Sequence, residues 1–583
     1  MSEEESKATA GSAEGAEQTA KKPKGPSKFS LLLNKYFHHV DRGGSLGGEV
    51  MAGIVGFLIA ISLLMVNMQV VCASVLGDIT LSSSPANASN IAYALEYAQI
   101  YAASVLVAFI GTLVIGLVAR LPFIQLSVMG LGTSFLSLLG TGSGLTYYNI
   151  LFVDFIAAVL YAVIVGVPFI KKAVFNALPK SLRKAIPAVV GSILIVLALQ
   201  MSGFFTTTEV STGTVSGLAG LTFTAFSEST RDLTTYAFIG AVVAVAVYFV
   251  FRALKFKHPV FWSFIIGTLL FIVIDIINYG FDTSSTEGFI NFGRVWVAAG
   301  SQSSDTTPFA DSYLSYFGDA FSEIFSNIGS VFTEGSDFSA YTGNTVAFII
   351  SGIIAFLLLG LYGTQGVMDA CESDIKCSDD AKAYDKAFWC NAGMNVVAPL
   401  FGVGAVGIST VSVANTKDNG KSGLTSVVAS IGFLISLFII AFPLITATYT
   451  YPVTGMNVWN YNAYGNGGMV YLLQSLQFGI ADAVLLCVGV SMVVTSLKEL
   501  DWGNATEALS AVVMIVVGLL FANLVYALAA GIIMYTVVKF FSFRKEGEKL
   551  FAACKSNFVA NVLEIGIPTA VLFVLVIVMA ILL

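Results

Sequence analysis

The residues best suited to bind a small molecule lie at the end of one apolar stretch. Between Gly363 and Gly366, the chain places Thr364 and Gln365, a hydroxyl beside a side-chain amide. An amide carries donors and an acceptor on one flat group, which suits the edge of a planar heterocycle. The two glycines predict a backbone freed from regular helix packing, so that both side chains can face a planar ligand.

Two short Gly/Ser/Thr-rich stretches, 123–140 and 403–416, supply further polar groups. Each is long enough for only a half-span of membrane helix. A helix that starts at mid-membrane presents free N–H groups and a partial positive charge to a polar cavity. Two such helix starts facing each other would form a pocket without charged side chains. The predicted lining residues are Ser127, Ser409, Thr410, Ser412 and Asn415, with Thr364 and Gln365 as a third wall.

One acidic residue lies well inside an apolar run. Asp154 is more than a turn from the start of its run, whereas Asp275 and Asp482 lie nearer to the ends of theirs. Carboxylates within membrane spans are rare and usually functional. Asp154 is therefore the candidate for a proton or cation relay, and the alternative is a buried, hydrogen-bonded structural acid.

The composition indicates the class of protein. Of the 583 residues, 56% are hydrophobic and only 11% are charged, and the mean hydropathy is +0.83. A soluble protein carries about a quarter charged residues, so the chain is predicted to be an all-α polytopic membrane protein. Residues 1–30 are Ser-, Ala-, Glu- and Lys-rich without an apolar core, which is typical of a disordered tail and not of a signal peptide.

Several functions are excluded by what the sequence lacks. The six cysteines are scattered without a CxxC pair, and the three histidines lie at segment edges. No metal site, cofactor or disulfide framework is therefore expected. A phosphate-binding GxxxxGK[ST] motif is absent, which argues against an ATP-driven pump. No nucleophile–base pair or metal-ligand spacing supports an enzyme, and no nucleic-acid partner is expected.

Apolar runs of spanning length predict the membrane helices. They lie near 50–72, 97–119, 149–169, 185–203, 235–253, 259–278, 345–363, 386–404, 424–447, 478–497, 504–521, 522–541 and 561–583. If both broken stretches also cross and the amino-terminal tail is cytoplasmic, 27 of the 29 Lys and Arg residues lie inside, leaving Arg231 and Arg294 outside. That asymmetry agrees with the positive-inside rule. The broken stretches are then crossings three and ten, seven apart, as in the inverted repeats of secondary transporters.

Several stretches resemble the nucleobase–cation symporter family (xanthine/uracil permease superfamily), in its adenine/guanine/hypoxanthine permease branch. They include "LNKYFHHVDRGGSLGGEVMAGIVGFLIAISLLMVN" at 33–67, "LPFIQLSVMGLGTSFLSLLG" at 121–140, "LPKSLRKAIPAVVGSILIVLALQMSGF" at 178–204, "GKSGLTSVV" at 420–428 and "KELDWGNATEALSAVV" at 498–513. Met129 stands in the family's third-crossing motif, and Tyr362 in its eighth-helix motif, which adds both to the predicted binding residues. The family's acids are replaced here by Gly360, Gly363 and Val411, so weak or atypical proton coupling is expected.

The resemblance implies fourteen crossings in two inverted seven-crossing repeats with two half-helices, divided into a core and a gate domain. The expected segments are a disordered cytoplasmic tail (1–33), core (34–180), gate (181–280), an extracellular loop (281–344), core (345–450), gate (451–545) and an extra carboxy-terminal span (546–583). The predicted function is secondary transport of a purine-like nucleobase or similar small planar solute at the plasma membrane, with a homodimer as one possibility for assembly. The alternatives are an anion transporter of the same fold and a transport-dead membrane receptor or scaffold.

Overall fold

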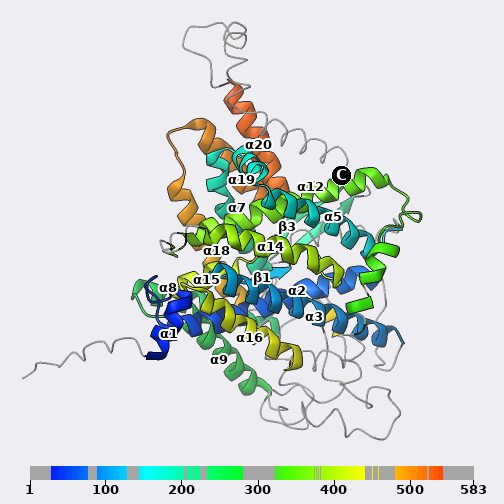
Figure 1. Cartoon of the computed structure of the whole chain (residues 1–583). Coiled ribbons are helices and arrows are strands. Elements are labelled where there is room, and N and C mark those ends of the chain that lie inside the picture. The colour runs from blue at the N-terminus through cyan, green and yellow to red at the C-terminus, as the bar shows by residue number, and fades with distance from the viewer. Residues whose placement is uncertain are drawn as a thin grey trace, which may run out of the picture.

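The computed structural model is a mainly helical bundle (Figure 1). It describes residues 28–76, 88–127, 144–201, 206–212, 215–222, 233–279, 322, 324–326, 328–372, 374–375, 377, 380, 382–439, 449–450, 457–458, 480–521 and 524–541. Most of the predicted tail, most of the 281–344 loop, the first half-helix and the extra carboxy-terminal span lie outside these residues.

The first half of the chain carries these elements: α1 (Lys28–Phe37), α2 (Leu46–Leu76), α3 (Ala88–Val114), the π-helical turn η1 (Ile115–Ala119), β1 (Gln125–Ser127), α5 (Tyr147–Gly166), α6 (Pro168–Ala177), α7 (Lys180–Met201), β2 (Thr206–Thr212), β3 (Val215–Thr222), α8 (Leu233–Ala253) and α9 (Pro259–Tyr279). The second half carries α12 (Thr345–Leu358), the π-helical turn η5 (Leu359–Gly363), α13 (Thr364–Glu372), α14 (Ala383–Leu400), β4 (Val406–Ile408), α15 (Val411–Lys417), α16 (Gly423–Ile439), β5 (Tyr449–Thr450), β6 (Asn457–Val458), α18 (Ile480–Glu499), α19 (Ala505–Phe521) and α20 (Leu524–Phe541).

Each predicted apolar run within the described residues forms a helix. Three of these helices, Ala102–Ala119, Tyr147–Gly166 and Thr345–Glu372, are long and apolar enough to cross a membrane by length and composition. The mainly helical structure agrees with the prediction of an all-α polytopic membrane protein, and three short two-stranded antiparallel sheets accompany the helices. One is the β2–β3 hairpin, which lies in a segment expected to be a loop. The other notable pair, β1–β4, joins the two broken stretches.

Helices from the first half of the chain pack against helices from the second half, which we call the exchanged packing of the two halves. The helix α16 packs against α2 and α3, while α5 packs against α12 and α14. Likewise α7 packs against α18 and α19, while α18 packs against α7 and α8. Neighbouring helices also pack within each half, α8 against α9 and α19 against α20. The described helices of the two halves of the chain are therefore interleaved.

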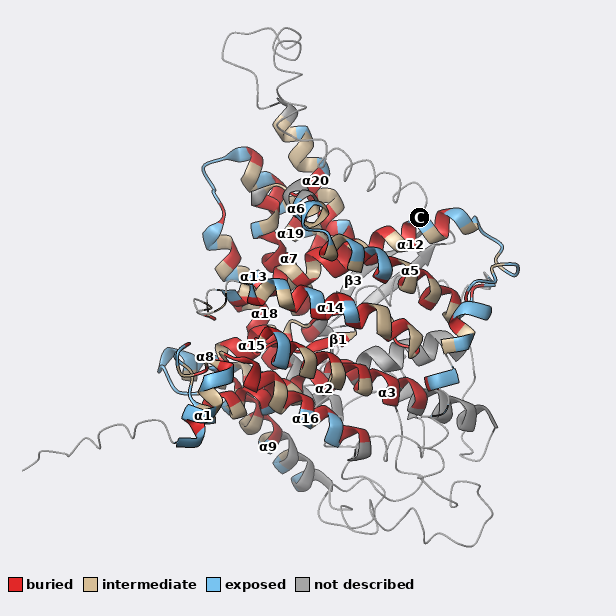
Figure 2. Cartoon of the chain, in the orientation of Figure 1, coloured by how far each residue is buried: buried red, intermediate tan, exposed pale blue. Residues whose placement is uncertain are grey.

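Glycine allows the closest of these contacts. Gly191 on α7 and Gly489 on α18 face each other, and a Cβ atom on either would lie 2.7 Å from the carbonyl oxygen of the other. Gly423 at the start of α16 meets Gly116 in η1, where a Cβ on Gly423 would lie 2.0 Å from the Gly116 oxygen. Small residues are the usual means of bringing membrane helices into backbone contact. Buried residues gather along these facing sides, as Figure 2 shows.

Candidate functional site

The two broken stretches meet as a short antiparallel ladder in the interior of the bundle. Strand β1 pairs with β4 in the register Gln125 to Ile408 and Ser127 to Val406. The outer edges of both strands are satisfied by helix side chains. Asn395 of α14 donates to the Val406 carbonyl (2.6 Å) and accepts from the Val406 N–H (3.0 Å). Thr112 of α3 accepts the Gln125 backbone N–H at 3.1 Å. Extended backbone at this depth is thus paired on both sides, as a dry environment requires.

The ladder places the predicted serines and Thr410 in different surroundings. The Ser412 hydroxyl is fully buried and bridges the backbone of Ile124, accepting its N–H at 3.0 Å and lying 3.4 Å from its carbonyl oxygen. It therefore holds the two broken stretches together. Ser127, Ser409 and Thr410 are half-buried at the ends of the ladder. Met129, the remaining predicted residue of the first broken stretch, lies outside the described residues.

A buried polar network joins four elements beside the ladder. The Asn391 amide on α14 accepts from Gln125 Nε2 at 2.7 Å. It donates to the Tyr161 hydroxyl on α5 at 2.9 Å and to the Thr364 hydroxyl on α13 at 3.4 Å. All four side chains are at most 3% exposed. The predicted binding residue Thr364 thus contacts a fixed network instead of an open space.

The helix around Thr364 stays continuous, which corrects the expectation of a freed backbone. The departure from α-helix is the π-helical turn η5, which ends at Gly363. Such turns are frequent at functional sites because they insert one residue and shift the following side chains. Gly366 serves close packing, since a Cβ there would lie 2.2 Å from Ile186 Cγ2 on α7. The Tyr362 hydroxyl donates to the Val174 carbonyl on α6 at 3.0 Å.

A cavity of about 530 Å³ opens where α13 and α15 face α7 and α18. Its volume falls in the range of roughly 300–1,000 Å³ usual for small-molecule sites. Its lining residues are Arg183, Lys184, Pro187, Gln365, Asp369, Ala370, Glu372, Val413, Lys417, Ser491, Met492, Thr495, Ser496 and Glu499. Three of them are basic and three are acidic, so the wall is close to electrically neutral.

Gln365 is the predicted site residue that lines this cavity. Its Oε1 atom is buried and has no hydrogen-bond partner among the described residues. Its neighbour Thr364 turns instead into the Asn391 network. The end of η5 therefore directs one polar side chain to the core of the bundle and the next to the cavity. The side chain of Gln365 is only partly buried and lines the cavity, whereas its Oε1 atom is covered by the surrounding protein.

Asp154 lies on α5 beside the turn that leads into β4. Its side chain is 1% exposed, and its carboxyl accepts the backbone N–H of Ala405. Its Oδ2 atom has no partner in the part of the chain that the structure describes, and it lies 3.9 Å from where a Cβ on Gly404 would be. The acid is thus next to the second broken stretch, and one of its two buried oxygens has no hydrogen-bond partner among the described residues.

A histidine–aspartate pair links the end of the second half-helix to α9. Asp418, which caps α15, is fully buried, and its Oδ2 lies 3.4 Å from His258 Nδ1. The same ring nitrogen lies 3.2 Å from the Asp418 carbonyl oxygen. Hydrogen bonding to Asp418 raises the pKa of His258 above its ordinary 6.5. Burial raises the pKa of Asp418, although the His258 contact partly opposes that shift.

The pair should make thermal stability depend on pH. Because the folded-state pKa of His258 is raised, its stabilising contribution is fully present below about pH 6.5 and is lost as the pH rises through the folded-state value. His258→Gln is expected to cost about 1–3 kcal/mol at low pH and almost nothing at high pH. Apparent melting temperatures of both proteins at about pH 5.5 and 8.5 test this. An equal loss at both pH values would show that the charge on His258 contributes nothing.

Sequence reasoning missed Gln125, Tyr161, Asn391 and Asn395. A signal for two of them was present, since Asn391 and Asn395 are four residues apart within the apolar run 386–404 and so share one helix face. Polar residues on one face of a membrane helix usually find partners in the bundle. No comparable pattern marks Gln125 or Tyr161, whose roles depend on contacts with distant segments.

Comparison with known proteins gives two relatives that span most of the chain. A chain of Methanocaldococcus jannaschii described as a permease is 21% identical over 525 residues, covering 88% of this chain and 94% of the relative. The guanine/hypoxanthine permease PbuO of Bacillus subtilis is 20% identical over 511 residues, covering 86% and 94%. No family model matches the sequence.

Two solved structures were also matched. One is the transmembrane domain of a cyanobacterial bicarbonate transporter, BicA, with a TM-score of 0.40 and 12% identity, covering 84% of this chain and 97% of that one. The other is the murine anion transporter Slc26a9 in its inward-facing state, with a TM-score of 0.40 and 12% identity, covering 90% and 74%.

The sequence relatives and the apolar helices agree on the class of protein. The chain is an integral membrane transport protein and not an enzyme. Its resemblance to the nucleobase permease family, first visible in its helix motifs, is confirmed over most of its length.

Proposed function

We propose that this protein is a secondary transporter for a purine-like nucleobase or a similar small planar solute. The observation that carries the proposal is the cavity at the junction of α13 and α15 with α7 and α18, which is lined by Gln365, a side-chain amide whose buried Oε1 atom has no partner among the described residues. The nearly neutral wall favours an uncharged solute over an inorganic anion, because an anion site would need an excess of basic groups or donors. The guanine/hypoxanthine permease among the relatives supports a purine.

The cavity also has the position expected for alternating access. It lies between α13 and α15 of the predicted core segment 345–450 and α7 and α18, which belong to the predicted gate segments 181–280 and 451–545. The exchanged packing of the two halves supports fourteen crossings in two inverted repeats. Movement of the core segments against the gate segments would open the cavity to one side and then to the other.

Uptake by the full-length protein in proteoliposomes tests this function. Radiolabelled hypoxanthine should accumulate and be displaced by excess guanine but not by excess bicarbonate or sulfate. Displacement by the anions alone would favour an anion transporter. Binding of purine without uptake would instead favour a receptor, and neither binding nor uptake would remove the purine proposal.

The proposal places the amino terminus and the segment 171–184, which spans most of α6 and the start of α7, in the cytoplasm of a plasma-membrane protein, on the basis of the charge distribution. Cysteine labelling from outside cells is expected to modify Ser303→Cys and to spare Lys172→Cys, a position whose side chain is exposed in the structure. Labelling of Lys172→Cys in intact cells, with Ser303→Cys spared, would reverse the topology.

Asp154 is the proposed site of any remaining proton coupling, because the family's acids are absent at Gly360, Gly363 and Val411. Asp154→Asn keeps the size of the side chain and its hydrogen bond from Ala405, but removes the titratable group. Stimulation of uptake by an inward proton gradient is expected to disappear in this variant, while uptake without a gradient persists. Undiminished stimulation would exclude Asp154 as the relay.

A further inference from the structure

Helix α1 exposes large apolar side chains although it lies outside the apolar runs. Phe29, Leu31, Leu32 and Tyr36 are 63%, 51%, 70% and 44% exposed. The opposite side of the helix faces the protein through Ser30 and Phe37, which are buried. Both charged residues of the helix, Lys28 and Lys35, are basic and exposed. An amphipathic helix with an exposed apolar face and basic flanks is suited to lie in a membrane interface.

The α8–α9 loop repeats this chemistry at the same end of the molecule (Figures 1 and 2). Leu254 and Phe256 are 69% and 51% exposed, and they alternate with the exposed lysines Lys255 and Lys257. The Phe256 ring is supported from behind by Phe251, with ring centroids 4.9 Å apart. The sequence contains no acidic residue from 28 to 37 or from 252 to 258. We call these ten residues the basic apolar patch: Phe29, Leu31, Leu32, Tyr36, Leu254, Phe256, Lys28, Lys35, Lys255 and Lys257.

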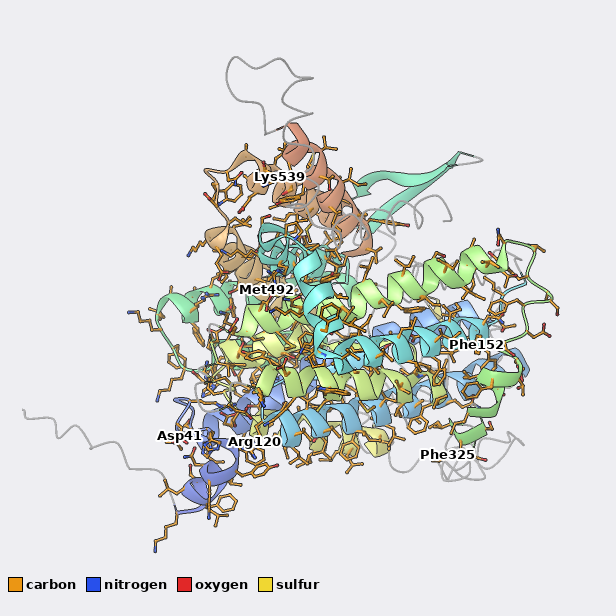
Figure 3. The ribbon with its side chains drawn as sticks, turned by 45° about the horizontal axis from the view of Figure 1, so that its top comes forward. Asp41, Arg120, Phe152, Phe325, Met492 and Lys539 are labelled. Atoms are coloured by element: carbon orange, nitrogen blue, oxygen red, sulfur yellow. The ribbon has the colours of Figure 1, made fainter. Side chains whose placement is uncertain are left out.

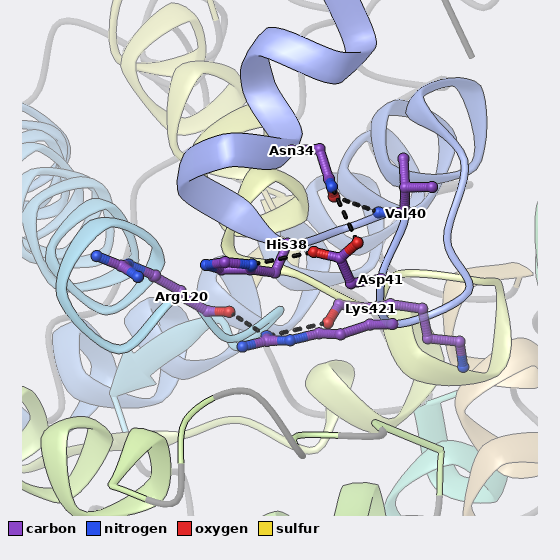
Figure 4. Close-up of polar contacts among 7 residues, drawn as sticks. Asn34, His38, Val40, Asp41, Arg120 and Lys421 are labelled. Carbon is purple, nitrogen blue, oxygen red and sulfur yellow. Dashed lines mark hydrogen bonds and ion pairs between the residues drawn. The ribbon is translucent and has the colours of Figure 1, made fainter.

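Polar contacts hold α1 firmly to the body of the protein. Asn34 accepts the Val40 N–H at 2.7 Å and donates to Asp41 at 3.1 Å, which closes the turn after the helix (Figure 4). The Tyr36 hydroxyl donates to the Leu117 carbonyl at 2.9 Å. These contacts fix the orientation of α1, and in that orientation its apolar side chains face away from the protein.

The segment after α1 connects the patch to both broken stretches. Arg42 donates to the Arg120 carbonyl at 2.6 Å and to the Lys421 carbonyl at 3.3 Å (Figure 4). Arg120 ends η1 just before β1, and Lys421 follows α15. The α8–α9 loop reaches the same turn through His258 and Asp418. A displacement of the patch would therefore be transmitted, through these hydrogen bonds, to the two segments that form the interior ladder.

We propose that the basic apolar patch docks on the surface of a bilayer that contains anionic lipids, and that this docking steadies the ends of the broken stretches. The apolar side chains would enter the boundary between headgroups and acyl chains, while the four lysines would attract the negative surface. Patches of exposed apolar residues with a charged rim generally mark an interaction surface. The four charged residues of the patch are all basic, which matches an anionic headgroup layer better than a neutral one.

Hydrogen exchange of the full-length protein in nanodiscs tests the proposal. Amides of residues 28–37 and 252–258 are expected to exchange at least fivefold more slowly in discs of phosphatidylcholine with about one third phosphatidylglycerol than in phosphatidylcholine alone. Raised salt should reduce the difference, because screening weakens the attraction of the lysines. Equal exchange in the two kinds of disc would overturn the proposal.

Two variants separate the apolar and basic contributions. Leu31→Gln/Leu32→Gln and Lys28→Gln/Lys35→Gln should each remove most of the lipid dependence without lowering the melting temperature in detergent. Phe325→Gln/Phe332→Gln is the matched control, since both side chains are exposed and Phe325 lies at the opposite end of the molecule from Asp41 (Figure 3). The control should keep the full lipid dependence. Lipid dependence that survives both patch variants, or that vanishes on removal of residues 1–27 alone, would overturn the proposal.

Discussion

Replacing Asn391 with leucine is expected to destabilise the protein more than any other single change to the interior network. The Nε2 group of Gln125 would lose its acceptor, the Asn391 side-chain oxygen. Its Oε1 atom already has no partner among the described residues, so the whole amide would then be unpaired there. Tyr161 and Thr364 would each lose the bond that Asn391 donates. Because these side chains are buried, the unpaired amide costs its full desolvation energy, and the expected loss is about 2–4 kcal/mol.

The measurement is the melting temperature and the yield of monodisperse protein for Asn391→Leu. Gly393→Ala is the matched control on the same helix, because a Cβ there would meet no atom within 4 Å. The control should behave like the wild type. A leucine variant as stable as the control would show that the network contributes no stability and that its residues are free to serve the substrate.

The second large effect is expected at the cavity. Gln365→Ala removes the side-chain amide from the cavity wall, and purine affinity is expected to fall by about 1–3 kcal/mol because a ligand polar group loses its partner. That loss corresponds to roughly five- to 150-fold in Kd. Gln365→Glu should instead introduce proton-dependent binding, since it returns an acid close to the position where the family carries one.

Ligand affinity and melting temperature measured on the same purified variant separate binding from packing. Ser496→Ala is a useful control at the cavity wall, because the Ser496 hydroxyl is already bonded to the Lys184 carbonyl and should contribute little to the ligand. If Gln365→Ala lowers the melting temperature but leaves Kd unchanged, Gln365 is a packing residue. Ser127, Ser409 and Thr410, at the ends of the ladder, would then be the remaining candidates.

Part of the site was predictable because its signals are local. The pair Thr364 and Gln365 stands out as polar residues at the end of an apolar run, and Asp154 as an acid within another. Which of them face a cavity was not predictable. Thr364 and Gln365 are adjacent in sequence, yet one joins the Asn391 network and the other lines the cavity. Ser412, predicted to bind a ligand, has its hydroxyl within hydrogen-bond distance of the Ile124 backbone.

The sequence by itself determined the helices and the two interruptions among them. An apolar run of about 20 residues can make all of its backbone hydrogen bonds within one helix, so whether it forms a helix depends on local composition alone. The short strands β1 and β4 within these interruptions cannot satisfy their own backbone, and only the tertiary structure decided what does. Gln125 and Asn391, 266 residues apart, meet because two halves of the chain interlock around the ladder. Hydrogen bonds between such distant segments depend on which helices lie side by side, and no local pattern of residues specifies that.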